Sequence, residues 1–454
     1  MLGRWPAAVA GAILLGLVGG ALAERKPGTA VIICVVIGGI IALAMLGERA
    51  FPWAVVIVAV APWYPFVSQA AEAPLVRQKV IVSAVAAAPL APWLWSLASR
   101  GGTTRPSRPA LLMGVLFAGL TILIYDTVGS VTALISTGVV GFIFIGVTFL
   151  CARRFGQGRG WLAAAFGGLV ILGLLGADAY VKSPSNRVGY FVGYPITYGA
   201  LVVGLLPAGL LFAYQRSRLL AGGLAAGSAA LLIFSESRSS WVAATVLLMI
   251  AVALQARAGN YRALGAVVAV IVVLAGLIVG TGSLNHIIEK KLSSNITSTT
   301  SVTHRQWSYG YALETIGHQP FFGAGAPGFS SRESLNKTNI GAIDNGYLSI
   351  TVDMGLIGLI GALIPIGVAL RVLGRCLRLG VTPRHELALA LGIVGMAVVT
   401  IFYDSFYWAQ IDLLLGAMGG VLSVRLGRIG QPHAGLEQEP ARAGRRRAGV
   451  RLAT

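Results

Sequence analysis

Two arginines in polar stretches of the sequence have the chemistry to bind a diphosphate. Arg238 lies in the run SRSSW between two apolar segments, and its nearest counter-charge in the sequence is Glu236. Arg305 lies in the first turn of an expected amphipathic helix over 302–316, where unpaired backbone N–H groups also favour an anion. A guanidinium pairs well with phosphate oxygens. A structural alternative stays open for each arginine. Arg238 would extend from a tight turn to the membrane surface, and the helix that carries Arg305 would lie on lipid headgroups.

Asp344 is the candidate general base. It stands at the start of an apolar segment, followed by Asn345, Gly346 and Tyr347. A carboxylate at a membrane surface can take a proton from a sugar hydroxyl, and partial burial would raise its pKa towards a useful range. The same residues also suit a helix N-cap, for which Asp and Asn are preferred, so both interpretations stay open.

His318 and Asp353 are secondary candidates, together with Asn345 and Tyr347 as acceptor contacts. His318 precedes the glycine-rich run FFGAGAPGF, and a histidine at such a place is more often a cap than a catalyst. The glycines permit a tight backbone close to a ligand or another helix. Asp353 would lie about 13 Å beyond Asp344 along a helix, where a charge needs a partner or a polar cavity.

The elements that must position these residues are membrane helices. The chain of 454 residues is 56% hydrophobic and only 11% charged. Its long apolar runs each suffice to cross a hydrocarbon core of about 30 Å as a helix. Because these runs are continuous rather than alternating, they indicate an all-α polytopic membrane protein and not a β-barrel.

The apolar runs predict about 12–14 transmembrane helices. They cover residues 7–23, 29–46, 50–66, 80–98, 110–125, 131–152, 161–180, 195–214, 219–235, 241–257, 262–281, 346–370, 386–403 and 410–425. We therefore expect four parts: N-terminal transmembrane helices over 1–281, an extracytoplasmic loop with the catalytic and binding residues over 282–345, C-terminal transmembrane helices over 346–426, and a basic, disordered cytoplasmic tail over 427–454.

The net charge of +19 is explained by topology. Basic residues gather in loops that fall on one side when the spans are counted in order. They include Arg100, Arg105, Arg108, Arg153, Arg154, Arg159, Arg216, Arg218, Arg257, Arg262, Arg375, Arg378, Arg384, Arg425 and Arg428. By the positive-inside rule that side is the cytoplasm, so both termini are expected inside and residues 181–194, 236–240 and 282–345 outside. Membrane lipid, and not nucleic acid, is the partner that this pattern favours.

Other chemistries find no support in the sequence. There is no P-loop, no GxGxxG after a strand, no HExxH and no GxSxG, which argues against nucleotide-driven and metalloprotease activities. The three cysteines, Cys34, Cys151 and Cys376, fall in or beside apolar spans without ligand-like spacing. We therefore expect neither a disulfide framework nor a zinc site.

Three motifs together carry a resemblance to a known family. SRSSW, the R-x-W of HRQWSYGYALETIGHQPFFGAGAPGF, and DNGYLSITVDMGLIGLIGAL resemble the O-antigen ligase and O-antigen polymerase (Wzy-like) superfamily of bacterial membrane glycosyltransferases. The resemblance covers about residues 140–420. It implies a helical GT-C-type fold in the bacterial cytoplasmic membrane. It also implies transfer of glycan from a polyprenyl-diphosphate carrier to an acceptor hydroxyl, without nucleotide sugar, metal or other cofactor.

The resemblance also implies roles for individual residues. Arg238 and Arg305 match family arginines that bind the diphosphate, and Arg187, in NRVGYFVGYPITYGA, matches a third. Asp344 departs from the ligase pattern, since ligases usually carry His there, whereas Asp is familiar in polysaccharide polymerase-like relatives. In the expected mechanism the arginines stabilise the leaving diphosphate, Asp344 assists the acceptor hydroxyl, and the anomeric centre is inverted.

Three alternatives to a polymerase remain open from the sequence. A ligase would move a finished glycan onto a lipid or protein acceptor. A cell-wall transglycosylase of the shape, elongation, division and sporulation type also uses an Asp in a large outside loop, but its expected motifs are not found. A non-enzymatic transporter of lipid-linked glycan would line a central path with charged groups, and Asp353 is the one residue that favours it.

Overall fold

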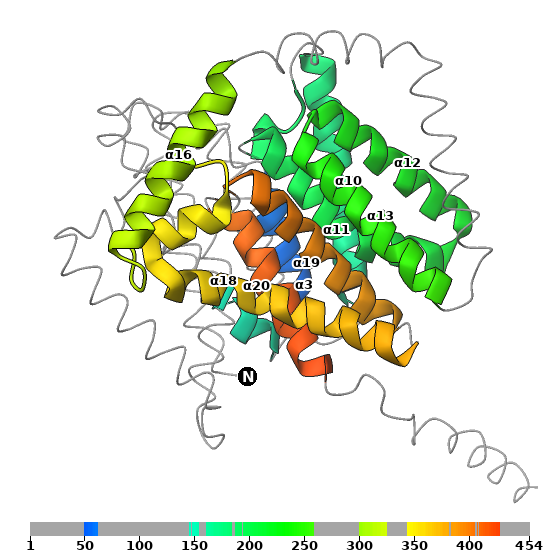
Figure 1. Cartoon of the computed structure of the whole chain (residues 1–454). Helices are drawn as coiled ribbons and strands as arrows, with labels where there is room; N and C mark the ends of the chain where they lie inside the picture. The colour runs from blue at the N-terminus through cyan, green and yellow to red at the C-terminus, as the bar shows by residue number, and fades with distance from the viewer. Residues whose placement is uncertain are drawn as a thin grey trace, which may run out of the picture.

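The computed structural model describes the chain in several segments. These are residues 50–61, 145–146, 148–153, 160–183, 187–192, 194–257, 299–324, 343–380, 383–404, 406 and 408–426, of which 255, 299–306 and 409 are described as backbone only. Every regular element in these segments is a helix, which confirms the expected all-α class (Figure 1).

The helices follow the chain in a simple order. They are α3 (Phe51–Val60), α10 (Gly160–Lys182), the 3-10 helix η4 (Tyr190–Val192), α11 (Pro195–Arg216), α12 (Arg218–Ser235), α13 (Arg238–Arg257), α16 (Thr299–His318), α18 (Gly346–Leu379), α19 (Arg384–Phe402) and α20 (Ala409–Arg425). Five of these, α10, α11, α12, α18 and α19, are long and apolar enough to cross a membrane. The chain is a polytopic membrane protein, as its composition predicted.

Most predicted spans that fall on described residues coincide with one helix each. Those over 161–180, 195–214, 219–235, 241–257, 386–403 and 410–425 agree with a helix to within a few residues at either end. α3 covers the first part of the span over 50–66. The spans over 7–23, 29–46, 80–98, 110–125 and 262–281 lie outside the described residues, as do the tail over 427–454 and most of the span over 131–152.

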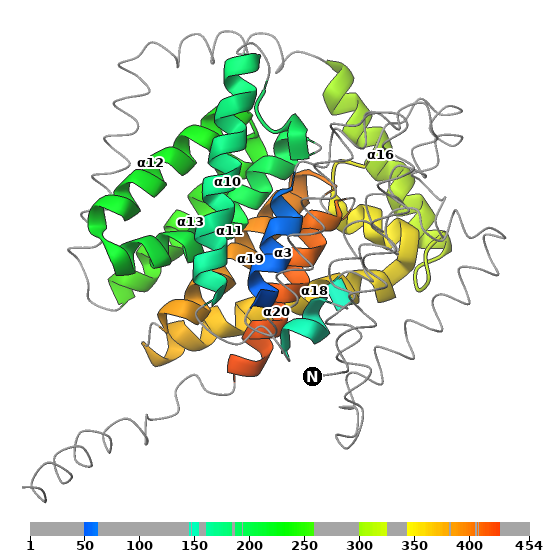
Figure 2. The ribbon, with the colours of Figure 1, turned by 180° about the vertical axis from the view of Figure 1, so that it is seen from behind.

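The centre of the bundle is formed by α11, α19 and α20, with α3 packed between α10 and α20 (Figures 1 and 2). α12 lies at the edge and is largely exposed. Small residues let the central helices approach closely: a Cβ atom on Gly392 of α19 would lie 2.2 Å from the carbonyl oxygen of Gly204 on α11. Such close backbone packing holds helices together in lipid, where apolar surfaces gain little by meeting one another.

The bundle has two chemically different ends. At the arginine-rich end, Arg425 Nη1 lies 2.7 Å from Glu386 Oε1, and Arg375 Nη1 donates to the Leu426 carbonyl at 2.9 Å. The helix ends at Arg216, Arg218, Arg257, Leu379 and Arg384 lie on the same side. The opposite end is built from residues 187–192, 194, 236–240, 343–349, 403, 404, 406 and 408, and we refer to it as the Asp344 end.

α18 is broken at Gly355, which corrects the expectation of one continuous span over 346–370. Gly355 has φ 65° and ψ −164°, a conformation essentially restricted to glycine. The loop after α16 fills the break, since Leu356 N donates to the Pro320 carbonyl at 2.8 Å and Ala324 N donates to the Val352 carbonyl at 2.7 Å. These bonds satisfy backbone groups that the break would otherwise leave unpaired.

α16 packs on the short part of α18, residues 346–354. α16 is longer at both ends than the helix expected over 302–316. Tyr309, Ala312 and Ile316, at spacings of three and four residues, lie on one packed face of α16. Their apolar partners are Ile343, Leu348 and Val352.

We expect Gly355→Ala to unfold the protein more easily. Alanine is strained at φ 65° by roughly 1–3 kcal/mol, and its Cβ would lie 2.3 Å from the Phe321 carbonyl group. Gly367→Ala, on the same helix with nothing within 4 Å of the new Cβ, is the matched control and should be neutral or stabilising. Thermal unfolding in detergent, followed by intrinsic fluorescence, compares the two; equal midpoints would contradict the tight contact between the loop and the break.

Candidate functional site

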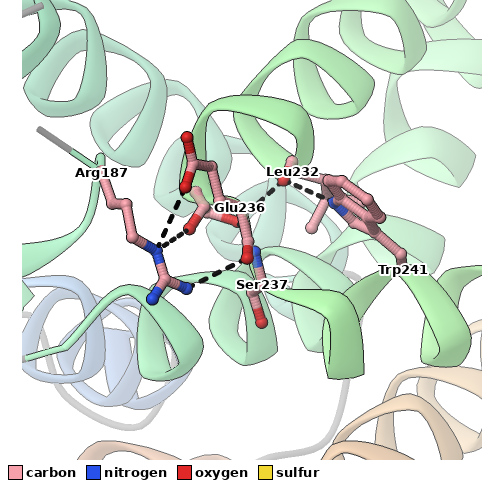
Figure 3. Close-up of polar contacts among 6 residues, drawn as sticks. Arg187, Leu232, Glu236, Ser237 and Trp241 are labelled. Carbon is pink, nitrogen blue, oxygen red and sulfur yellow. Dashed lines mark hydrogen bonds and ion pairs between the residues drawn. The ribbon is translucent and has the colours of Figure 1, made fainter. Parts of the chain in front are cut away.

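Arg187 binds the turn between α12 and α13. Its Nε donates to the Ser235 carbonyl at 3.2 Å, and its Nη2 donates to the Glu236 carbonyl at 3.0 Å (Figure 3). The same Nε lies 3.8 Å from Glu236 Oε2. Glu236 has φ 51°, and it is the only residue other than glycine with a positive φ in the described segments. The guanidinium therefore holds a left-handed turn in place, and Glu236 serves as a counter-charge for Arg187.

The serines of the SRSSW motif are buried and bonded to one another. The Ser237 hydroxyl lies 2.7 Å from that of Ser240 and 3.2 Å from that of Ser239. A Cβ on Gly199 of α11 would lie 2.2 Å from Ser240 Oγ, so the backbone of α11 packs directly on this hydroxyl. The serines hold the turn against α11 and do not face solvent.

Arg238 is the exposed member of the motif. It is the first residue of α13, which corrects the expected turn over 236–240 to a turn at 236–237 followed by helix. Trp241, one turn on, donates its Nε1 to the Leu232 carbonyl at 2.8 Å and ties α13 back to α12 (Figure 3). Arg238 thus has a rigid base and an accessible side chain, which suits it to bind an anion.

Asp344 lies where α16 meets α18. The hydroxyl of Tyr309 donates to the Asp344 carbonyl at 3.2 Å. The N-cap of α18 is Asn345, whose Oδ1 accepts from Tyr347 N at 3.0 Å and Leu348 N at 3.1 Å. Of the two interpretations of this sequence, the cap belongs to Asn345, and the half-buried Asp344 carboxylate is not needed for it.

Asp404 is a second carboxylate at this place, and sequence reasoning missed it. Ser349 Oγ donates to Asp404 Oδ2 at 2.8 Å, and Gly346 N donates to the Tyr403 carbonyl at 3.2 Å. Asp404 therefore lies against the same short helix that begins behind Asp344. A signal existed in the sequence: the run YDSFYW places an acid among aromatic residues between two predicted spans.

An aromatic stack connects the two halves of the Asp344 end. The rings of Tyr194 and Tyr403 are stacked, with centroids 5.7 Å apart and planes 9° apart. Trp408 Nε1 donates to the Tyr403 hydroxyl, and Gln410 Nε2 donates to the Val192 carbonyl at 3.1 Å. The segment that carries Arg187 is thus fastened to the turn that carries Asp404.

Asp412 is another acid that sequence reasoning missed. It lies within the predicted span over 410–425 and is fully buried in α20. Neither of its carboxylate oxygens has a hydrogen-bond partner among the described residues. An ionised carboxylate is costly in such surroundings, so a neutral acid is the form that the site favours.

The remaining predicted residues fall in different places. His318 is the exposed last residue of α16. Asp353 is 3% exposed and lies two residues before the break in α18. Tyr347 donates its hydroxyl to the Ala397 carbonyl at 2.9 Å, which joins α18 to α19. The backbone of Arg305 lies in α16, and its side chain is outside the described residues.

Residues 223–363 match the family model described as O-Antigen ligase, Wzy_C. This segment is an O-antigen ligase family domain. The resemblance of the motifs is therefore confirmed over about a third of the chain. No curated protein matches the chain.

The Wzy_C segment contains most of the predicted site. It runs from α12 into the long part of α18, which follows the break at Gly355, and it includes Arg238, Arg305 and Asp344. Arg187 and Asp404 lie outside it and reach it only through the fold, by the contacts with the α12–α13 turn and with Ser349.

We predict that Arg187→Lys destabilises the α12–α13 turn. A lysine cannot reproduce two hydrogen bonds in a fixed fork, so an apparent loss of roughly 1–2 kcal/mol is expected. Lys182→Ala is the matched control, because the Lys182–Asp178 pair is exposed and contributes little. Hydrogen exchange of residues 232–241 in detergent is the measurement; unchanged protection in Arg187→Lys would contradict a structural role.

Proposed function

We propose that the protein is a membrane glycosyltransferase, which transfers a glycan from a polyprenyl-diphosphate carrier to an acceptor sugar hydroxyl. The observation that carries the proposal is the Wzy_C match over 223–363, because this one segment contains Arg238, Arg305 and Asp344 in the order of the family motifs. Glycan transfer in polysaccharide biosynthesis is the activity that the family name indicates.

In this proposal the arginines bind the donor. Arg238 is exposed on a turn that packing and hydrogen bonds make rigid, and Arg305 lies near the start of α16. Both guanidinium groups stabilise the negative charge that grows on the leaving diphosphate. Arg187 is the third candidate, but its Nε and Nη2 are engaged with the turn, so we assign it chiefly to positioning Arg238.

A carboxylate assists the acceptor. The acceptor hydroxyl oxygen attacks the anomeric carbon from the side opposite the carrier, the bond to the diphosphate breaks, and the hydroxyl proton passes to Asp344. The outcome is inversion, with polyprenyl diphosphate as the leaving group and no metal in any step. Asp404 supports the same role as a second candidate, since it lies against the same short helix and is bonded to Ser349. His318, Asn345, Tyr347 and Asp353 are proposed as secondary or acceptor-side residues.

We place the Asp344 end outside the cytoplasmic membrane. The opposite end carries Arg216, Arg218, Arg257, Arg378 and Arg384, and the positive-inside rule assigns such an end to the cytoplasm. The donor diphosphate then lies at the outer leaflet, and both chain termini are cytoplasmic. The polar loop over 282–345 is the part that faces the acceptor.

We expect Arg238→Ala, Arg305→Ala and Asp344→Asn each to lower glycan transfer by about 10²–10³-fold, the typical effect of removing one group that stabilises transition-state charge. Transfer is measured with purified protein and a carrier-linked glycan. Lys182→Ala and Asp178→Asn remove charges from the same end outside the site and should keep normal rates. Normal transfer by both Arg305→Ala and Asp344→Asn would reject the assignment.

The same assay separates polymerase from ligase. We expect a ladder of glycan lengths on the carrier, because Asp344 stands where the ligase pattern has His. A single conjugate of a finished glycan with a lipid or protein would instead indicate a ligase. Assays in detergent, where there are no two compartments, distinguish an enzyme from a transporter: turnover of the donor requires an enzyme.

A further inference from the structure

We infer that the loop after α16, residues 319–324, is seated in the membrane near the outer boundary of the hydrocarbon layer. Lipid acyl chains, and not water, cover the exposed apolar face that it shares with α16. We define this apolar face as Leu313, Phe321 and Phe322. The inference concerns the membrane contact of the proposed outside loop and does not depend on which reaction the protein catalyses.

The first observation is the exposure of large apolar side chains. Leu313 is 61% exposed, Phe321 63% and Phe322 50%. The other side of α16 already packs on α18 through Tyr309, Ala312 and Ile316. The outward side of α16 also carries the exposed Glu314 and His318, so the lipid contact is assigned to Leu313 and the loop and not to the whole helix.

The second observation is the connection of this loop to α18. Leu356 N donates to the Pro320 carbonyl at 2.8 Å, and Ile357 N donates to the Phe321 carbonyl at 3.4 Å. The first residues of the long part of α18 also point large apolar side chains outward, with Leu356 39% and Ile360 62% exposed. The apolar face of the loop thus continues into the exposed face of a helix that crosses the membrane.

The third observation sets the depth of the loop. Leu356 lies fifteen residues before the exposed Arg371, about 22 Å along a helix. Counted to Arg375 the length is about 28 Å, and counted to Arg378 it is about 33 Å. Because the hydrocarbon core is about 30 Å thick, these lengths bring Leu356 close to its far boundary, and tilt moves it deeper. With these arginines at the opposite interface, Leu356 lies near the outer boundary of the hydrocarbon, and the bonded Phe321 lies there with it.

The contact between loop and break leaves little room for the loop to move out. A Cβ on Gly323 would lie 2.6 Å from backbone atoms of Asp353, Met354 and Gly355. Gly323 has φ 71° and Gly355 has φ 65°. The loop and the break therefore meet at two glycines with positive φ, whose backbones are in direct contact. The depth of the C-terminal end of α16 is therefore set by α18, and the apolar face is held against lipid.

The test uses an environment-sensitive fluorophore on single cysteines. Phe321→Cys and Phe322→Cys are made in full-length protein with Cys34→Ala; Cys151 and Cys376 are buried and stay. Each variant is labelled with NBD and placed in phosphatidylcholine–phosphatidylglycerol nanodiscs. Ile360→Cys is the lipid-facing control, and Lys182→Cys, on an exposed side chain at the Asp344 end, is the water-facing control. Labelled protein without the new cysteine gives the background.

We expect doxyl-labelled lipid to quench probes at positions 321 and 322 as strongly as at Ile360→Cys, and iodide to quench them several-fold less than at Lys182→Cys. Strong quenching by iodide would overturn the inference, since the loop would face water. Quenching by neither agent would also overturn it, since another part of the chain or a second copy would cover the face. If Phe321→Cys does not fold, Phe322→Cys carries the same test.

Discussion

The contact between the 319–324 loop and the break in α18 is the constraint on which the rest of the Asp344 end depends. A helix that stops inside a membrane leaves backbone N–H and carbonyl groups without partners, and lipid cannot supply any. Here the loop supplies them, through Pro320, Phe321 and Ala324. The short part of α18 can therefore take its own direction, and it presents Asp344 and Ser349 at the edge of the bundle.

The polar side of the Asp344 end is assembled from segments far apart in the sequence. Arg187 orders the turn before Arg238, the Tyr194–Tyr403 stack joins that region to the α19–α20 turn, and Asp404 reaches Ser349. Each link uses hydrogen bonds or ring contacts rather than apolar packing alone. This matters in a membrane, where apolar helix surfaces gain little by leaving lipid for one another.

Arg187 and Arg238 have different roles because their surroundings differ. Arg187 has two nitrogens engaged with backbone carbonyls, which makes it a structural residue as well as a candidate ligand. Arg238 rises from the turn that Arg187 holds and is exposed. A guanidinium on a rigid base loses less conformational freedom when it binds a phosphate, which is the physical advantage of building the motif on buried serines.

The sequence by itself determined the class of the protein, most of the described helix bounds and the motifs of the Wzy_C segment. These follow from local properties: long apolar runs, the positions of arginines in loops, and residue types at short spacing. Only the tertiary structure decided that α18 breaks at Gly355, that Asn345 and not Asp344 is the helix cap, and that Asp404 joins the site. A sequence pattern cannot show which distant carbonyl will satisfy a freed N–H group, because that depends on how the helices pack.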